Sequence, residues 1–69
     1  MQIKYFQDTD TLLVVLTETK VKETKDIDEN TLLDLDEEGK VVSITIEHAK
    51  ERINIDSISF EQVKPNVAA

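Results

Sequence analysis

The chain has no cysteine and no tryptophan, and only one glycine, one proline, one histidine and one tyrosine among its 69 residues. Without cysteine it can form no disulfide, no thiolate nucleophile and no thiolate metal site. A single glycine, Gly39, excludes a glycine-rich phosphate loop, and a single histidine excludes a histidine cluster for zinc. These absences remove the common sequence signatures of enzymes and metal proteins.

The shortness of the chain limits how much apolar surface it can bury. A domain of 69 residues has a marginal core, and disulfides and structural metals, the usual supports of small domains, are not indicated here. Self-association is the remaining general route to additional burial. We therefore expect one domain over residues 1–65, a disordered tail over residues 66–69, and a homodimer.

Acidic residues outnumber basic ones by 15 to 8, which gives a formal net charge of −7. This balance opposes nucleic acid as a partner and favours a basic protein surface. Met1 is followed by neither a basic segment nor an apolar leader, and no apolar run approaches the roughly 20 residues of a membrane span. We expect a cytoplasmic protein that binds no membrane.

The most informative pattern is a predicted β-hairpin over residues 32–46. Leu33 and Leu35 alternate with acidic residues, and Val42, Ile44 and Ile46 alternate with smaller or polar ones. An acidic turn that ends near Gly39 joins the two runs. Period-two alternation on both sides of a short turn with glycine is typical of a hairpin.

Further strands are predicted on the N-terminal side of the hairpin. Residues 3–6 are short and β-prone, and a charged, exposed strand is expected within residues 20–28. Between them, residues 12–16 are all apolar, so a strand there presents apolar side chains on both faces. Either the monomer covers both faces or a second copy covers one of them.

The C-terminal third is less regular. Ile46, Ala49 and Ile53 have helical spacing, which predicts a helical turn or two over residues 48–52. Residues 58–63 alternate and favour a strand, although a helix capped by Asp56 competes, and Pro65 ends regular pairing. The predicted fold is α+β, mainly β: a small antiparallel, meander-like sheet of four to six strands with one short helix.

Two segments together resemble the Domain of Unknown Function 2283 family of small prokaryotic proteins. The first is Ile3-x-Tyr5, an acidic turn with Asp10, and the apolar run of residues 12–16. The second runs from Leu33 through the acidic turn to Ile46, with Ala49 following. The resemblance implies a small mainly β or α+β domain of uncharacterised role, similar in size to the smaller partners of toxin–antitoxin pairs. It supplies no catalytic residue.

Two acidic turns are candidates for a metal or catalytic site. Asp34, Asp36, Glu38 and Gly39 match the first positions of a calcium loop, but position 12 is Thr45 rather than the required glutamate. The favoured interpretation is a solvated hairpin turn. In the other turn, Asp8 and Asp10 form a carboxylate pair, which is simpler to explain as satisfying turn backbone groups.

His48 would need a nucleophile and an orienting partner to act as a base. Ser43 and Asp34 can be named for these roles, but a surface histidine is the simpler interpretation. The acidic span of residues 26–38 contains no basic residue and is expected to be a solvated face, or else a docking face for a basic protein. Its members are Asp26, Asp28, Glu29, Asp34, Asp36, Glu37 and Glu38.

No catalytic, cofactor-binding or metal-binding residue is therefore predicted. The sequence favours a non-enzymatic, homodimeric protein-interaction module. The alternative is an antitoxin-like acidic partner that neutralises a small, basic, RNA-cutting toxin.

Overall fold

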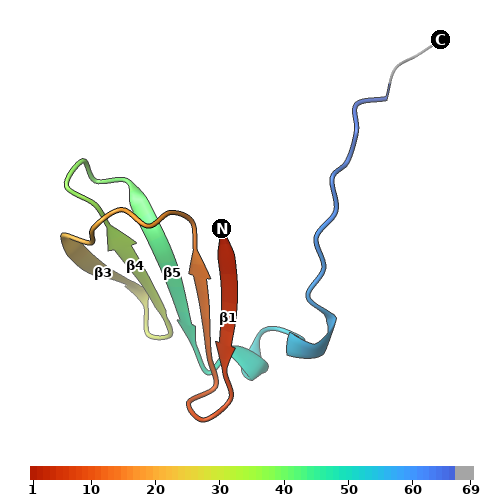
Figure 1. Ribbon diagram of the computed structural model, residues 1–69. Coiled ribbons are helices and arrows are strands. Elements are labelled where there is room, and N and C mark those ends of the chain that lie inside the picture. The colour runs from red at the N-terminus through yellow and green to blue at the C-terminus, as the bar shows by residue number, and fades with distance from the viewer. Residues whose placement is uncertain (67–69) are drawn as a thin grey trace.

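A computed structural model describes residues 1–66 and places five strands in one antiparallel sheet, in the order β1-β2-β5-β4-β3 (Figure 1). The mainly β prediction is confirmed, and the number of strands lies within the predicted range. The strands are β1 (Gln2–Phe6), β2 (Thr11–Val15), β3 (Glu23–Asp28), β4 (Thr31–Leu35) and β5 (Val41–Glu47).

A helical turn does form within residues 48–52, but as a 3-10 turn, so the predicted short helix and the α+β class are wrong. Residues 1–66 contain two 3-10 turns, η1 (Ala49–Glu51) and η2 (Ile55–Ser57), and no α-helix. His48 precedes η1 in the left-handed conformation (φ 53°, ψ 45°), and Arg52 leaves helical geometry at φ −125°. Because the backbone departs from helical angles on both sides, η1 cannot lengthen into the helix that its apolar spacing suggests.

The meander-like arrangement is also wrong, because β5 lies between β2 and β4. The connection from β2 to β3, residues 16–22, crosses the end of the sheet near the start of β5 and the end of β4. Its backbone is fixed there: the N–H groups of Leu16 and Thr17 donate to Val42 O, and Lys22 N donates to Leu35 O at 2.8 Å. A nonlocal crossover thus replaces the direct pairing of β2 with β3 that a meander requires.

The predicted hairpin between β4 and β5 is confirmed. Asp36 organises its turn, because Oδ1 accepts hydrogen bonds from Glu38 N and Lys40 N, each 2.9 Å long. Gly39 N donates to Asp36 O, and Gly39 adopts φ +82°, which glycine tolerates better than other residues. A register shift between Asp34 and Leu35 marks a bulge where the strands meet the turn.

The two faces of the sheet differ in composition. The strand registers place mostly large aliphatic side chains on one side, which we call the aliphatic face. Its apolar and aromatic members are Ile3, Tyr5, Leu12, Val14, Leu33, Leu35, Val42, Ile44 and Ile46, and the same side also carries Thr31, Glu23 and Lys25. The opposite, mixed face carries Lys4, Phe6, Leu13, Val15, Leu32, Asp34, Ser43 and Thr45. The buried residues Leu12, Leu35 and Val42 all belong to the aliphatic face.

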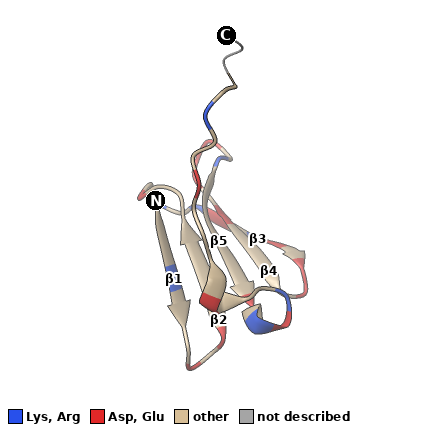
Figure 2. Ribbon diagram, turned by 90° about the vertical axis from the view of Figure 1, so that its right-hand side faces the viewer, with Lys and Arg blue, Asp and Glu red and all other residues tan. Residues whose placement is uncertain are grey.

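Residues 58–63 form neither the predicted strand nor the competing helix. Beyond η2, which Asn54 rather than Asp56 caps, the chain is extended without a strand partner and runs away from the sheet (Figures 1 and 2). We call residues 58–66 the C-terminal arm. The tail predicted at residues 66–69 lies outside the described residues from residue 67 onward.

Candidate functional site

Asp10 joins the turn between β1 and β2 to the chain that follows β5. It adopts φ 52°, a conformation that short polar residues tolerate better than most. The Tyr5 hydroxyl donates to Asp10 Oδ1 over 2.6 Å, and Lys50 N donates to the same carboxylate at 3.1 and 3.3 Å. Ala49 N donates to Asp10 O at 3.0 Å, and Ala49 is fully buried there. We call this arrangement the Asp10 junction.

The hydrogen bond at the Asp10 junction separates the pKa values of its two members. Donation to the carboxylate, with smaller effects of burial and of the negative charges of Asp10 and Asp56, raises the pKa of Tyr5 to about 12. The same bond lowers the pKa of Asp10 below its usual range. At neutral pH the phenol is neutral and the carboxylate charged. This geometry stabilises a turn and does not provide a group whose pKa matches proton transfer near pH 7.

The other carboxylate of the predicted pair, Asp8, takes no part in this junction. It lies in the exposed turn, where the Thr11 hydroxyl donates to Thr9 O at 3.3 Å and Thr9 Oγ1 donates to Thr11 Oγ1 at 2.9 Å. The structure therefore does not use Asp8 and Asp10 as a pair. Asp10 instead binds donors from β1 and from the residue that follows Ala49.

Asp34 occupies a second polar junction, on the mixed face. Its Oδ1 accepts from the Thr24 hydroxyl and its Oδ2 from the Ser43 hydroxyl, both at 2.6 Å. Ser43 is buried, and its pairing with a carboxylate satisfies its hydroxyl. The junction therefore links β3, β4 and β5 side chain to side chain.

The structure brings two members of the considered hydrolytic triad together but not the third. Ser43 and Asp34 are hydrogen-bonded, whereas His48 follows the end of β5, and its Nδ1 lies 2.9 Å from Asn30 Oδ1. At about 3.3 Å per strand residue, Ser43 lies roughly 13 Å from the end of β5. His48 is therefore placed to hold the turn between β3 and β4, and not to take a proton from Ser43.

Around His48, a cluster of polar contacts closes that corner of the sheet. Asn30 O accepts from Glu47 N at 2.7 Å, and Asn30 N donates to Asp28 Oδ1 at 2.9 Å. Hydrogen bonds from Asn30 and Thr31 to the Asp28 carboxylate lower the pKa of Asp28. The positive charge of Arg52, whose Nη1 lies 3.6 Å from Asp28 Oδ2, lowers it further. The Arg52–Asp28 ion pair is half exposed, and such pairs contribute little to stability.

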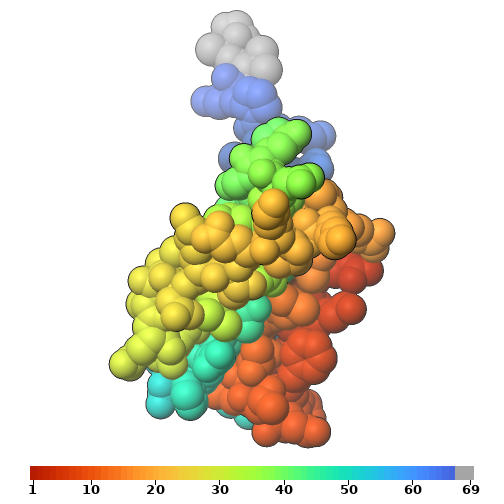
Figure 3. Space-filling model, turned by 90° about the vertical axis from the view of Figure 1, so that its left-hand side faces the viewer, coloured from red at the N-terminus to blue at the C-terminus, as the bar shows by residue number. Residues whose placement is uncertain are grey.

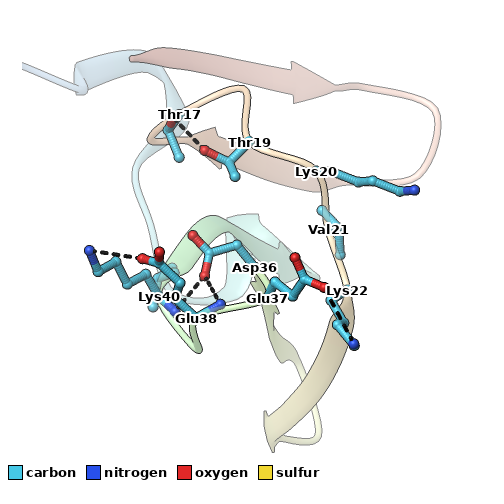
Figure 4. A pocket seen from close by; sticks show the side chains of 10 residues that line it. Thr17, Thr19, Lys20, Val21, Lys22, Asp36, Glu37, Glu38 and Lys40 are labelled. Carbon is cyan, nitrogen blue, oxygen red and sulfur yellow. Dashed lines mark hydrogen bonds and ion pairs between the residues drawn. The ribbon is translucent and has the colours of Figure 1, made fainter.

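An open hollow lies between the crossover connection and the hairpin turn (Figure 4). Four of its charged side chains form two ion pairs, Lys40 with Glu38 at 3.2 Å and Lys22 with Glu37 at 3.9 Å, all largely exposed. Asp36, also in its wall, already accepts two turn N–H groups. Binding pockets combine apolar walls with a few converging polar groups. This hollow has a predominantly charged rim whose charges offset each other.

The acidic span does not form a calcium loop. Asp34 and Asp36 accept hydrogen bonds from different parts of the protein, and Asp28 binds Asn30 and Arg52. Within residues 1–66, no three acidic or histidine side chains gather in a way that suits a metal ion. What remains of the span is exposed acidic residues on β3 and on the turns. Figure 2 marks the acidic positions along the backbone in red.

The two edges of the sheet differ in charge. All six residues of β3 are exposed, and four of them, Glu23, Lys25, Asp26 and Asp28, are charged. At the other edge, β1 has one charged residue, Lys4, between exposed Ile3 and Phe6. Charged side chains discourage pairing with another strand. The β1 edge is therefore the accessible one; Figure 3 shows both edges from the mixed face.

Sequence reasoning missed Tyr5, Lys50 and Arg52 as members of these clusters. Alternation along β1 places Tyr5 on the apolar side, and a turn aspartate five residues later is a usable signal for the Tyr5–Asp10 bond. Nothing local predicts the bond from Lys50 N, which spans 40 positions. Long-range polar contacts of this kind depend on the chain crossing that brings the segments together.

No helix among the described residues has the length and apolar character needed to cross a membrane. No curated protein and no solved structure matches the chain. The sequence does match, over residues 2–50, a family described as a protein of unknown function (DUF2283). This range contains all five strands, the Asp10 junction and Ala49, and ends before η2. The chain belongs to the DUF2283 family.

Proposed function

We propose that the protein is a non-enzymatic, homodimeric protein-interaction module whose aliphatic face packs against that of a second copy. The proposal is supported by a single-layer sheet whose aliphatic face has one exposed apolar residue, Ile3, and several only partly buried ones: Tyr5, Val14, Leu33, Ile44 and Ile46. The extended C-terminal arm adds to the exposed surface. The chain exposes 5831 Å². A compact protein of 7.9 kDa would expose about 4400 Å².

The difference of about 1400 Å² includes the exposed surface of the extended arm as well as that of the sheet, and a stable interface covers about 800 Å² on each partner. On the aliphatic side of β2, Val14 is only half-buried although β2 has neighbours on both sides. Either the monomer or a second copy could cover this side of the strand. Since residues 1–66 contain no second layer, a second copy is the one that we favour.

Light scattering during gel filtration tests this proposal. We expect a mass near twice 7.9 kDa at micromolar concentration. Ile3→Lys places a charge on the aliphatic face at an exposed position and should weaken the dimer. Gln2→Lys places the same charge on the opposite face of the same strand and is the matched control.

Circular dichroism of both variants distinguishes dissociation from unfolding. A monomeric wild-type chain at high micromolar concentration would contradict the proposal. So would an equal effect of the two variants on the dissociation constant.

A second candidate is the antitoxin-like role, supported by the exposed carboxylates on β3 and the turns. A basic toxin would meet them through complementary charge, so the complex should weaken with salt. Co-expression with the product of an adjacent gene that encodes a small basic protein tests this. Recovery of no complex at low salt would contradict it.

A further inference from the structure

The C-terminal arm carries exposed apolar side chains, two of them almost uncovered. Ile58, Phe60 and Val63 are 45%, 85% and 82% exposed. No hydrogen bond or ion pair within residues 1–66 joins the arm to the sheet. Its alternating sequence suits a strand, but a strand requires a neighbour with free backbone groups.

The outer edge of β1 also lacks a neighbouring strand. β1 pairs with β2 on one side only, and its other side presents unpaired backbone groups. Because β3 is protected by its charges, β1 is the edge on which an added strand would be favoured. Arm and edge therefore each lack the partner that the other could provide.

The arm leaves the sheet on the side of the aliphatic face. Tyr5 belongs to that face, and its hydroxyl shares the Asp10 carboxylate with Lys50 N, which holds the chain after β5 next to Tyr5. From η2 the arm runs in front of the sheet and away from it (Figures 1 and 2). A second sheet packed on the aliphatic face would lie about 10 Å from the first. The arm thus extends into the layer that the second sheet would occupy.

Resting on the proposed homodimer, we infer that the C-terminal arm of each copy adds as an antiparallel sixth strand to the β1 edge of the other copy. In Figure 1 the arm runs opposite in direction to β1. An antiparallel register with Phe60 opposite Tyr5 sets Glu61 opposite Lys4. It pairs two aromatic rings and two opposite charges, both favourable across strands.

The position of Pro65 agrees with this register. Counting from the Phe60–Tyr5 pair, Val63 lies opposite Gln2, so Pro65 falls beyond the first residue of β1. Proline cannot donate to a ladder and therefore belongs outside the paired segment. The elongated monomer also agrees: its radius of gyration is 14.9 Å, against about 11 Å for a compact chain of this length.

The test compares the full chain with a chain ending at Ser57. Loss of the buried arm should raise the dissociation constant about 30-fold or more, the equivalent of one well-buried aromatic side chain. Lys4→Glu and Glu61→Lys should each weaken the dimer, and the double variant should restore it. Lys64→Glu, outside the paired segment, is the control for a charge change in the arm.

Isotope-filtered nuclear Overhauser measurements on mixed labelled and unlabelled copies give a second readout. Contacts between the rings of Tyr5 and Phe60 should appear between copies. If the same contacts appear only within one copy, the arm folds back on its own β1 and the inference is overturned. A dimer that truncation at Ser57 leaves unchanged also overturns it while the proposed function survives, whereas a monomeric full chain contradicts the proposed function itself.

Discussion

The hydroxyl of Tyr5 and the carboxylate of Asp10, five residues apart, meet at 2.6 Å across the β1–β2 turn. The same carboxylate also accepts Lys50 N. One donor near in sequence and one from a distant segment therefore share a single charged acceptor. The tyrosine is the only one in the chain and there is no tryptophan, so its ionisation can be observed without interference.

Titration of the phenol should reveal this contact directly. The absorbance of the Tyr5 phenolate should appear with a midpoint near 12 in the folded protein, and near 10.0 after unfolding in urea. Asp10→Asn removes the charge and should lower the Tyr5 pKa towards 10.0. Asp8→Asn, in the same turn, should leave it near 12; equal behaviour of the two variants would contradict the assignment.

The free energy of unfolding should depend on pH at both extremes. The pKa of Tyr5 is raised in the folded state, so its contribution is complete below pH 10 and is lost as pH rises from 10 to about 12. The pKa values of Asp10 and Asp28 are lowered, so their contributions are present above their ordinary pKa of 3.8 and are lost as pH falls below it.

Urea denaturation at a series of pH values measures this dependence, with a plateau expected between about pH 5 and pH 9. Asp28→Asn should reduce the loss on the acid side. Asp26→Asn removes an equal charge from the same strand and serves as the control. A stability that rises towards pH 3 would be inconsistent with the bonding of both carboxylates.

Enlarging the buried side chain at position 49 should destabilise the fold. Ala49 has no exposed surface, so Ala49→Leu must displace its neighbours, at a cost of about 1–3 kcal/mol in the free energy of unfolding. Glu51→Leu adds an apolar side chain at an exposed position of the same turn and should change the stability by less than about 0.5 kcal/mol. Chemical denaturation of both variants provides the comparison.

Substitutions of Gly39 in the hairpin turn should change the stability through backbone conformation and not through steric crowding. Gly39 has φ +82°, and a Cβ placed there would meet no atom within 4 Å. Gly39→Ala should therefore cost about 1 kcal/mol through the left-handed conformation alone. Gly39→Asn should cost less, because asparagine tolerates that region better. Equal stability of all three proteins would show that the turn rearranges freely.

The strands could be predicted because each carries its own local signal. Alternation around Leu33 and Ile44, with a glycine turn between them, is sufficient to place β4 and β5. The strand order was not predictable in the same way, because β2 pairs with β5 through contacts such as Leu12 with Ile46, far apart in sequence. Local pattern says that a segment is extended, but not which neighbour it pairs with.

The same limit explains the C-terminal errors. Residues 58–63 alternate like a strand, yet in the monomer they have no partner, and a strand is defined by its pairing. The helical spacing around Ala49 is real but local, and the left-handed backbone of His48 confines it to one short turn. At the candidate site, Asp10 and Asp34 were recognised as notable, whereas their donors from distant segments were not.

The charges along β3 also bear on how many copies can join edge to edge. A sheet that could accept strands at both ends could add copies in series and grow into a fibril. Because β3 repels further strands, growth at that end is blocked, and joining at the opposite edge alone cannot propagate. The charges of β3 thus oppose amyloid-like polymerisation of a sheet whose other edge can pair with an added strand.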